Sequence, residues 1–185
     1  LIIFGAPLAC PDHAAKAVAC GLAMQLAMTE VNRRLVEKGA AALEMGIGVH
    51  TGRVIVGNIG SLRRTKYAAV GSNVNLAGRL SSAAKRPIEE DEGVFGALLE
   101  ALPVAGRGVS VDQDGTLFNE GIALSRDALA QLEAHLALVR SEEGVLEYED
   151  EAIDRRILIR YAGDAKFKGV RSSLPVYEAG YVGRG

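Results

Sequence analysis

The spacing of the apolar residues changes repeatedly along the chain, and this alternation limits the folds that are open to it. Leu1–Phe4 is a short apolar run that ends at Gly5-Ala6-Pro7, which predicts a buried strand followed by a turn. Between Asp12 and Gly39 the apolar residues follow the period of a long amphipathic helix. The stretch 43–57 has two β-rich halves around His50-Thr51-Gly52, which predicts a hairpin.

The same alternation continues to the end of the chain. The predicted strands are 67–71, 122–125, 156–161 and 174–177, the predicted helices are 73–84 and 127–139, and 58–66 is predicted to be a loop. Residues 85–120 differ in character, with an acidic run at 89–92, an apolar helix at 94–102 and a hairpin of 109–111 with 116–118. Because strands and helices alternate with hairpins among them, the predicted fold class is α+β or mixed α/β.

Composition and charge exclude several classes of function. A chain of 185 residues with 49% hydrophobic content suits one domain with a proper core. Its 21 basic and 23 acidic residues nearly cancel, so no broad field attracts nucleic acid or an anionic membrane. Cys10 and Cys20 lack the CxxC spacing and indicate a reducing compartment. No apolar run approaches the roughly 20 residues of a bilayer span, so we expect a soluble, cytoplasmic chain, with any membrane tether in other domains.

The common catalytic motifs are missing, and one polar pair stands out instead. The sequence has no GxxxxGK[ST], GxSxG or HExxH motif, and we expect the separated histidines, His13, His50 and His135, to be ordinary surface or turn residues. Asn75 and Arg79 lie four residues apart on a predicted helix and therefore share one face. An amide beside a guanidinium suits a sugar oxygen and a phosphoryl group. From spacing alone, a solvated arginine and a polar residue near the helix start remain open.

Two longer segments carry a family resemblance. They are Gly46-Ile47-Gly48-Val49-His50-Thr51-Gly52-Arg53-Val54 with Gly57-Asn58-Ile59-Gly60-Ser61, and Lys66-Tyr67-x-x-Val70-Gly71-x-x-Val74-Asn75-Leu76-Ala77-x-Arg79-Leu80. In order, spacing and residue type they resemble the central signature of class III adenylate and guanylate cyclases. Phe167-Lys168-Gly169-Val170 and Leu174-Pro175-Val176-Tyr177-Glu178 are similar to the family's closing strand pair. The resemblance covers about 1–84 and, more loosely, 121–182.

This resemblance implies an α+β fold of the ferredoxin-like palm type and a homodimer with its active site between the subunits. The implied reaction closes ATP, or less commonly GTP, to a 3′,5′-cyclic monophosphate and releases pyrophosphate. Two aspartates of one subunit hold two Mg²⁺ or Mn²⁺ ions that activate the 3′-hydroxyl. The other subunit supplies an asparagine that orients the ribose and an arginine that stabilises the transferring phosphoryl group. Asn75 and Arg79 match those two positions.

The resemblance assigns further positions and leaves others open. Lys168 matches the lysine that neutralises the terminal phosphates, and Arg53 matches an arginine of the same role in some members, or is a surface residue. Ala68 occupies the base-recognition position and offers no side-chain hydrogen bond to a purine. No metal ligand can be named in the chain, because the family's metal-binding aspartates fall before Leu1. We therefore expect a preceding segment of the domain and an inactive fragment.

The domain organisation follows from where the resemblance stops. We expect 1–185 to be a single cyclase catalytic domain with an insertion at 85–120, serving either as a surface elaboration or as a regulatory or docking subdomain. The main alternative function is a catalytically silent cyclase-homology domain for dimerisation or nucleotide sensing. A ferredoxin-like RNA-binding module is disfavoured, because only 5% of the residues are aromatic and the net charge is −2.

Overall fold

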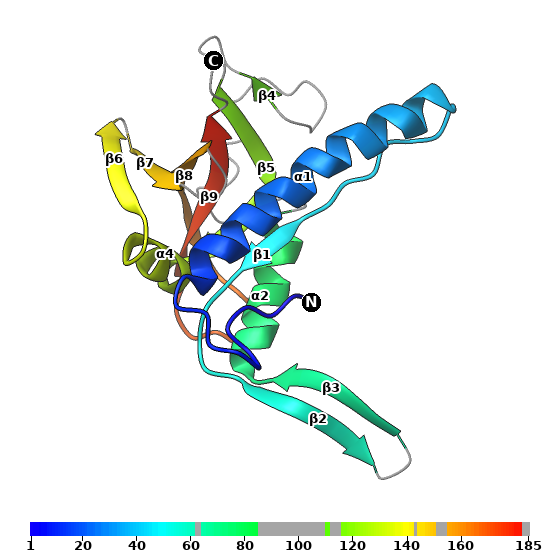
Figure 1. Cartoon of the computed structure of the whole chain (residues 1–185), viewed down its shortest axis with the longest axis vertical. Coiled ribbons are helices and arrows are strands. Elements are labelled where there is room, and N and C mark those ends of the chain that lie inside the picture. The colour runs from blue at the N-terminus through cyan, green and yellow to red at the C-terminus, as the bar shows by residue number, and fades with distance from the viewer. Residues whose placement is uncertain (62–63, 85–109, 112–115, 143, 151–154, 183–185) are drawn as a thin grey trace.

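A single large sheet carries most of the structure. The computed structural model describes residues 1–61, 64–84, 110–111, 116–142, 144–150 and 155–182, and in this part seven strands form the sheet (Figure 1). Its order is β1-β5-β9-β8-β7-β6, with β4 paired to β5. The strands are β1 (Ile47–Val49), β4 (Ser110–Val111), β5 (Thr116–Ser125), β6 (Ala137–Glu142), β7 (Val145–Asp150), β8 (Arg155–Ala165) and β9 (Leu174–Val182).

The pairing directions confirm the predicted α+β class. β1 runs parallel to β5, whereas the other neighbouring pairs in this sheet are antiparallel. The parallel pair needs a long crossover between its strands, and the described part of that crossover contains a hairpin and a helix. The sheet is therefore mainly antiparallel, with one parallel strand at its edge.

Two helices pack on one face of the sheet. α1 (His13–Glu37) begins after Asp12 and ends just before Gly39, whose φ of 74° is left-handed, so the helix that the apolar spacing predicted is confirmed. α4 (Arg126–Glu133) follows β5 directly, and its start is capped by the Ser125 side chain. The main buried side chains of this layer are Val18, Leu22, Ile122, Leu124, Leu129, Leu132, Ile157 and Ile159.

The third helix packs on the opposite face. α2 (Ser72–Ala83) places Leu80 in a second cluster, with Ala123 of β5 and Val176 of β9. Because successive residues of a strand point to opposite faces, Ala123 contacts this layer while its neighbours in β5 contact α1 and α4. α2 also packs against β1. The helix that carries Asn75 and Arg79 is thus fixed to the parallel β1–β5 pair.

A separate hairpin extends away from the body of the molecule (Figure 1). It consists of β2 (Ile55–Ser61) and β3 (Arg64–Val70), which pair antiparallel in a two-stranded sheet. Several large apolar side chains are exposed on it: Ile55, Ile59, Tyr67 and Val70. Hydrophobic side chains at this density on a projecting element are typical of an interaction surface.

Three predictions about the first 70 residues are wrong. Leu1–Phe4 was predicted to be a buried strand but lies outside both sheets, since no described strand pairs with it. Leu1 and Ile2 are 84% and 56% exposed. The stretch 43–57 is no hairpin, since its two halves pair with β5 and β3 instead of with each other. Most of the predicted loop 58–66 belongs to β2 and β3. Apolar alternation identifies extended segments but not their partners.

The second half shows one further error and several confirmed elements. The predicted helix 127–139 ends at Glu133, and its last residues belong to β6, because a short apolar run fits both periods. β6 and β7 were otherwise not predicted. The strands at 156–161 and 174–177 are confirmed within β8 and β9, and the hairpin near 110 and 117 is confirmed by the pairing of β4 with β5. The predicted helix 94–102 lies outside the described residues.

Candidate active site

α2 holds the two residues that the spacing singled out. Gly71, with φ 154°, joins β3 to the helix in a conformation that favours glycine. Leu80 is buried beneath α2, whereas Asn75 is exposed and Arg79 is half-buried. Both residues therefore lie on one helix, one turn apart, on the part of its surface that the core does not use.

Arg79 lies against the turn that contains Lys168. Its guanidinium is so close to Gly169 that a Cβ at this glycine would be 3.6 Å from Nη2 and 3.8 Å from Nη1. The turn is closed by a 3.0 Å hydrogen bond from the Val170 amide to the Phe167 carbonyl, and Gly169 has a left-handed φ of 78°. Lys168 is exposed beside it. The structure thus brings Arg79 and the Lys168 turn together from distant parts of the chain.

These cations are not neutralised by acidic side chains within the described residues. In this part of the chain, neither Arg79 nor Lys168 forms an ion pair. Arginines on the strands of the sheet do form them, such as Arg156 of β8 with Glu147 at 2.7 Å. Two unpaired cations on adjacent segments suit an anion with several charged oxygens.

Arg53 and Ala68 lie elsewhere around the start of α2. The Arg53 side chain is exposed and is not part of the contact between Arg79 and the Lys168–Gly169 turn. Its carbonyl oxygen accepts a 2.9 Å hydrogen bond from Asn73 Nδ2, so its backbone is tied to the first turn of α2. Ala68 is half-buried in β3, opposite Gly57 of β2.

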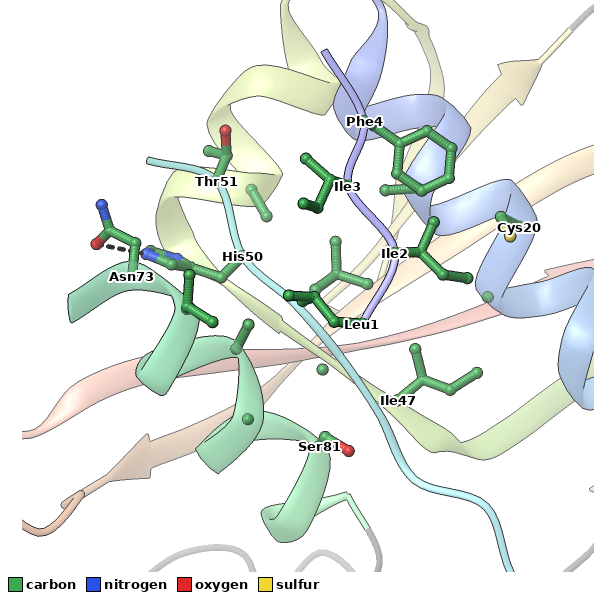
Figure 2. Close-up of a pocket in the computed structure, with 18 of the residues that line it drawn as sticks. Leu1, Ile2, Ile3, Phe4, Cys20, Ile47, His50, Thr51, Asn73 and Ser81 are labelled. Atoms are coloured by element: carbon green, nitrogen blue, oxygen red, sulfur yellow. Dashed lines mark hydrogen bonds between the residues drawn. The ribbon is translucent and has the colours of Figure 1, made fainter. Parts of the chain in front are cut away.

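The prediction that the histidines are ordinary surface or turn residues needs correction at His50 and at His13. His50 is half-buried, and both of its ring nitrogens have partners. Nδ1 lies 2.7 Å from Ser125 Oγ. Nε2 lies 3.1 Å from Asn73 Oδ1, the contact that is dashed in Figure 2. His13 is also half-buried between two partners: its Nδ1 lies 3.1 Å from the Cys10 carbonyl oxygen and its Nε2 lies 2.9 Å from Thr51 Oγ1. Sequence reasoning missed this network because Ser125 lies 75 positions away from His50.

Two glycines in the same motif are required by close packing. A Cβ at Gly48 would overlap the backbone of α2 at Ala77 and Ser81, and a Cβ at Gly52 would overlap the Asn73 amide. The two glycines that flank His50 could therefore have indicated from sequence that β1 and the following turn pack closely against α2.

A cavity of about 520 Å³ lies beside these elements, between the first residues, α1, β1 and α2 (Figure 2). Its wall includes Leu1, Ile2, Cys20 and Ile47, and the His50–Asn73 contact lies at one side. None of the predicted site residues, Arg53, Ala68, Asn75, Arg79 and Lys168, lines it. The cavity is therefore separate from the site that Arg79 forms with the Lys168–Gly169 turn.

Neither a metal site nor a membrane span is found in the described residues. No group of three or more histidine, cysteine, aspartate or glutamate side chains is placed there to hold an ion, and both cysteines are free. No helix of this part is long and apolar enough to cross a bilayer.

Comparison with known proteins identifies the matched segment. Residues 1–88 match the sequence profile of the Adenylate and Guanylate cyclase catalytic domain. This segment belongs to the adenylate and guanylate cyclase family. It contains β1, the β2–β3 hairpin and α2. Asn75 and Arg79 both lie within this matched segment.

Curated relatives of the cyclase segment are much longer than the match. Adenylate cyclase 1 of Rhizobium meliloti is 34% identical over 83 residues, which is 45% of this chain and 12% of that protein. An uncharacterized protein of Mycobacterium tuberculosis is 41% identical over 87 residues, which is 46% of this chain and 14% of its own length. The matched region thus spans about an eighth of these relatives.

Solved cyclases share the fold over most of the chain. The guanylyl cyclase Cya2 superposes with a TM-score of 0.57 and 30% identity, covering 95% of this chain and 62% of its own. The adenylyl cyclase CyaB from P. aeruginosa gives a TM-score of 0.60 at 21% identity, with 95% and 64% covered. The predicted cyclase palm is thereby confirmed as the fold class.

Proposed function

We propose that the natural protein carrying this chain is a nucleotide cyclase, which converts ATP, or less commonly GTP, to the 3′,5′-cyclic monophosphate and pyrophosphate. One observation supports this most strongly. The Arg79 guanidinium, without an ion pair in the described residues, lies against the Lys168–Gly169 turn, one helical turn from Asn75. The site thus offers an amide and two cations to a sugar triphosphate.

Each of these side chains has a distinct proposed role. Arg79 stabilises the charge that develops on the α-phosphoryl group during attack by the 3′-hydroxyl, and Asn75 orients the ribose. Lys168 contacts the terminal phosphates, and Arg53 contributes there as a second cation. Ala68 lies at the base and cannot select a purine edge through its side chain. Base choice therefore depends on other residues.

For the divalent ions, Mg²⁺ or Mn²⁺, that the resemblance implies, the described residues offer no group of three or more histidine, cysteine, aspartate or glutamate side chains. We propose that residues outside this part of the chain supply their ligands. The described residues are proposed to contribute the cationic and amide groups that bind and orient the nucleotide.

The proposed active assembly is a homodimer. Asn75 is exposed on α2, and the projecting β2–β3 hairpin presents Ile55, Tyr67 and Val70 to solvent. An exposed apolar hairpin next to a polar site is what a second subunit would cover. We also propose that 1–185 form one domain with 85–120 as an insertion, whose end joins the sheet through β4.

The competing proposal is a silent cyclase-homology domain that only dimerises or senses nucleotide. Ala68 and the insertion at 85–120 favour it, whereas the presence of both Asn75 and Arg79 opposes it. Incubating the purified natural protein separately with ATP and with GTP, in the presence of Mn²⁺, distinguishes the two. We expect cyclic nucleotide by mass spectrometry, faster from ATP. Binding of nucleotide with no product from either substrate would establish the silent domain.

Replacing Lys168 with alanine is expected to raise KM for the nucleoside triphosphate about tenfold, with a smaller change in kcat, because one charge-assisted contact of about 1.4 kcal/mol is lost. Steady-state kinetics measures this. Lys166→Ala is the matched control, since Lys166 is an exposed lysine two residues earlier in the same connection. Equal KM values for the two variants would remove Lys168 from phosphate binding.

A further inference from the structure

We infer that His50 is a positioning residue for α2: its imidazole links the cap of α4 to the first turn of α2 and so fixes the helix that presents Asn75 and Arg79. The structural part of this inference stands on the hydrogen bonds alone. Its catalytic consequence rests on the function proposed above.

The hydrogen bonds form one chain across three elements. Ser125 Oγ accepts the Ala128 amide at 3.2 Å and lies 2.7 Å from His50 Nδ1. His50 Nε2 lies 3.1 Å from Asn73 Oδ1, and Asn73 Nδ2 donates to the Arg53 carbonyl at 2.9 Å. The end of β5, the end of β1 and the start of α2 are therefore joined through one imidazole ring.

The direction of each proton follows from the two ends of this chain. A carbonyl oxygen only accepts, so the amide of Asn73 must turn its nitrogen toward Arg53 and its oxygen toward His50. His50 Nε2 then has to carry a proton. In a neutral ring, Nδ1 is then an acceptor for the Ser125 hydroxyl, whose oxygen remains free to accept the Ala128 amide. Of the two neutral tautomers, only the one with the proton on Nε2 satisfies every group in the chain.

This network anchors the start of α2 without capping it. The N-cap residue is Gly71, which has no side chain to accept a helix amide, and within the described residues the Val74 amide donates to the Gly71 carbonyl at 3.2 Å. Asn73 is the side chain of the first turn that is anchored outside the helix, and Gly52 leaves no room for it to move toward the β1 turn. A helix transmits a rotation at its first turn to later turns, so displacement of Asn73 would move Arg79 relative to Gly169.

Two substitutions separate the two arms of the network. His50→Gln places an amide donor near the position of Nε2, which keeps the contact to Asn73 and gives up Ser125. His50→Asn places an amide oxygen near Nδ1, which keeps Ser125 and gives up Asn73. The amides of residues 76–79 donate to the carbonyls of the first turn of α2. In the full chain, we expect their hydrogen exchange to accelerate at least tenfold in His50→Asn and less than threefold in His50→Gln.

The ring itself provides a measurement on the unmodified chain. Nitrogen-15 chemical shifts of the His50 imidazole are expected to show a proton on Nε2, the donor to Asn73. A ring with Nε2 unprotonated, or equal exchange in the two variants, would overturn the inference. Because the tautomer needs no variant, a substitution that fails to fold still leaves a decisive result.

Kinetics in the active protein adds a readout that a purely structural role would not give. We expect kcat to fall at least tenfold in His50→Asn with KM changed less than threefold, and His50→Gln to retain most of kcat. Absence of cyclase activity in the unmodified protein would refute the proposed function, while the tautomer and exchange results would still decide the position of α2. Equal kcat for the two variants would refute the catalytic consequence.

Discussion

Replacement of Arg79 with alanine is expected to reduce kcat of the natural protein by at least about 100-fold, which corresponds to the loss of one strong donor to charge in the transition state. Folding should change little, because Arg79 makes no ion pair in the described residues and the buried anchor of α2 is its neighbour Leu80. Initial rates with saturating nucleotide measure the loss, and thermal denaturation verifies the fold.

Two variants give this result its meaning. Arg79→Lys retains the charge but loses the planar fork, so it should recover only part of kcat. Arg171→Ala removes an exposed arginine from the connection that follows the Lys168 turn, and it should leave kcat unchanged. Turnover of Arg79→Ala at the unmodified rate would remove Arg79 from the mechanism.

Replacement of Gly48 with alanine is expected to lower the free energy of unfolding by about 3 kcal/mol, at the upper end of overpacking costs. The added methyl group would overlap backbone atoms of α2 at Ala77 and Ser81, which cannot move aside as a side-chain end would. Either the helix shifts away from β1 or the strand bends. Denaturant unfolding of the full chain measures the change.

Gly78→Ala is the matched control for this prediction. Gly78 lies inside α2, and a Cβ there would meet no atom within 4 Å. Alanine should therefore stabilise the helix by about 0.5–1 kcal/mol. If Gly48→Ala were as well tolerated as Gly78→Ala, the close approach of β1 to α2 would be refuted.

Local patterns predicted the elements that are long and periodic. α1 and α2 follow the helical period closely, with buried residues such as Val18, Leu22 and Leu80 on one face. β8 and β9 were recognised but proved longer than predicted. Pairing was the main failure, since the partners of β1 and β2 depend on tertiary packing rather than on local spacing.

The candidate site shows the same division. Helical spacing was enough to place Asn75 and Arg79 on one face, because both belong to a single element. The contact between Arg79 and Gly169 joins α2 to a turn near the end of the chain, and no local pattern encodes such a contact. For His50, the flanking Gly48 and Gly52 gave a signal of close packing, but its partner Ser125 became visible only in three dimensions.

The parallel pairing of β1 with β5 also determines when the site can form. α2 packs on both strands, yet β5 begins only at Thr116, far along the chain from β1 and after the end of α2 at Ala83. Contacts between distant segments carry a loop-closure cost that must be met before they contribute stability. Asn75 and Arg79 therefore acquire their fixed places only once the chain has grown past Ser125, which makes assembly of the nucleotide site a late step in folding.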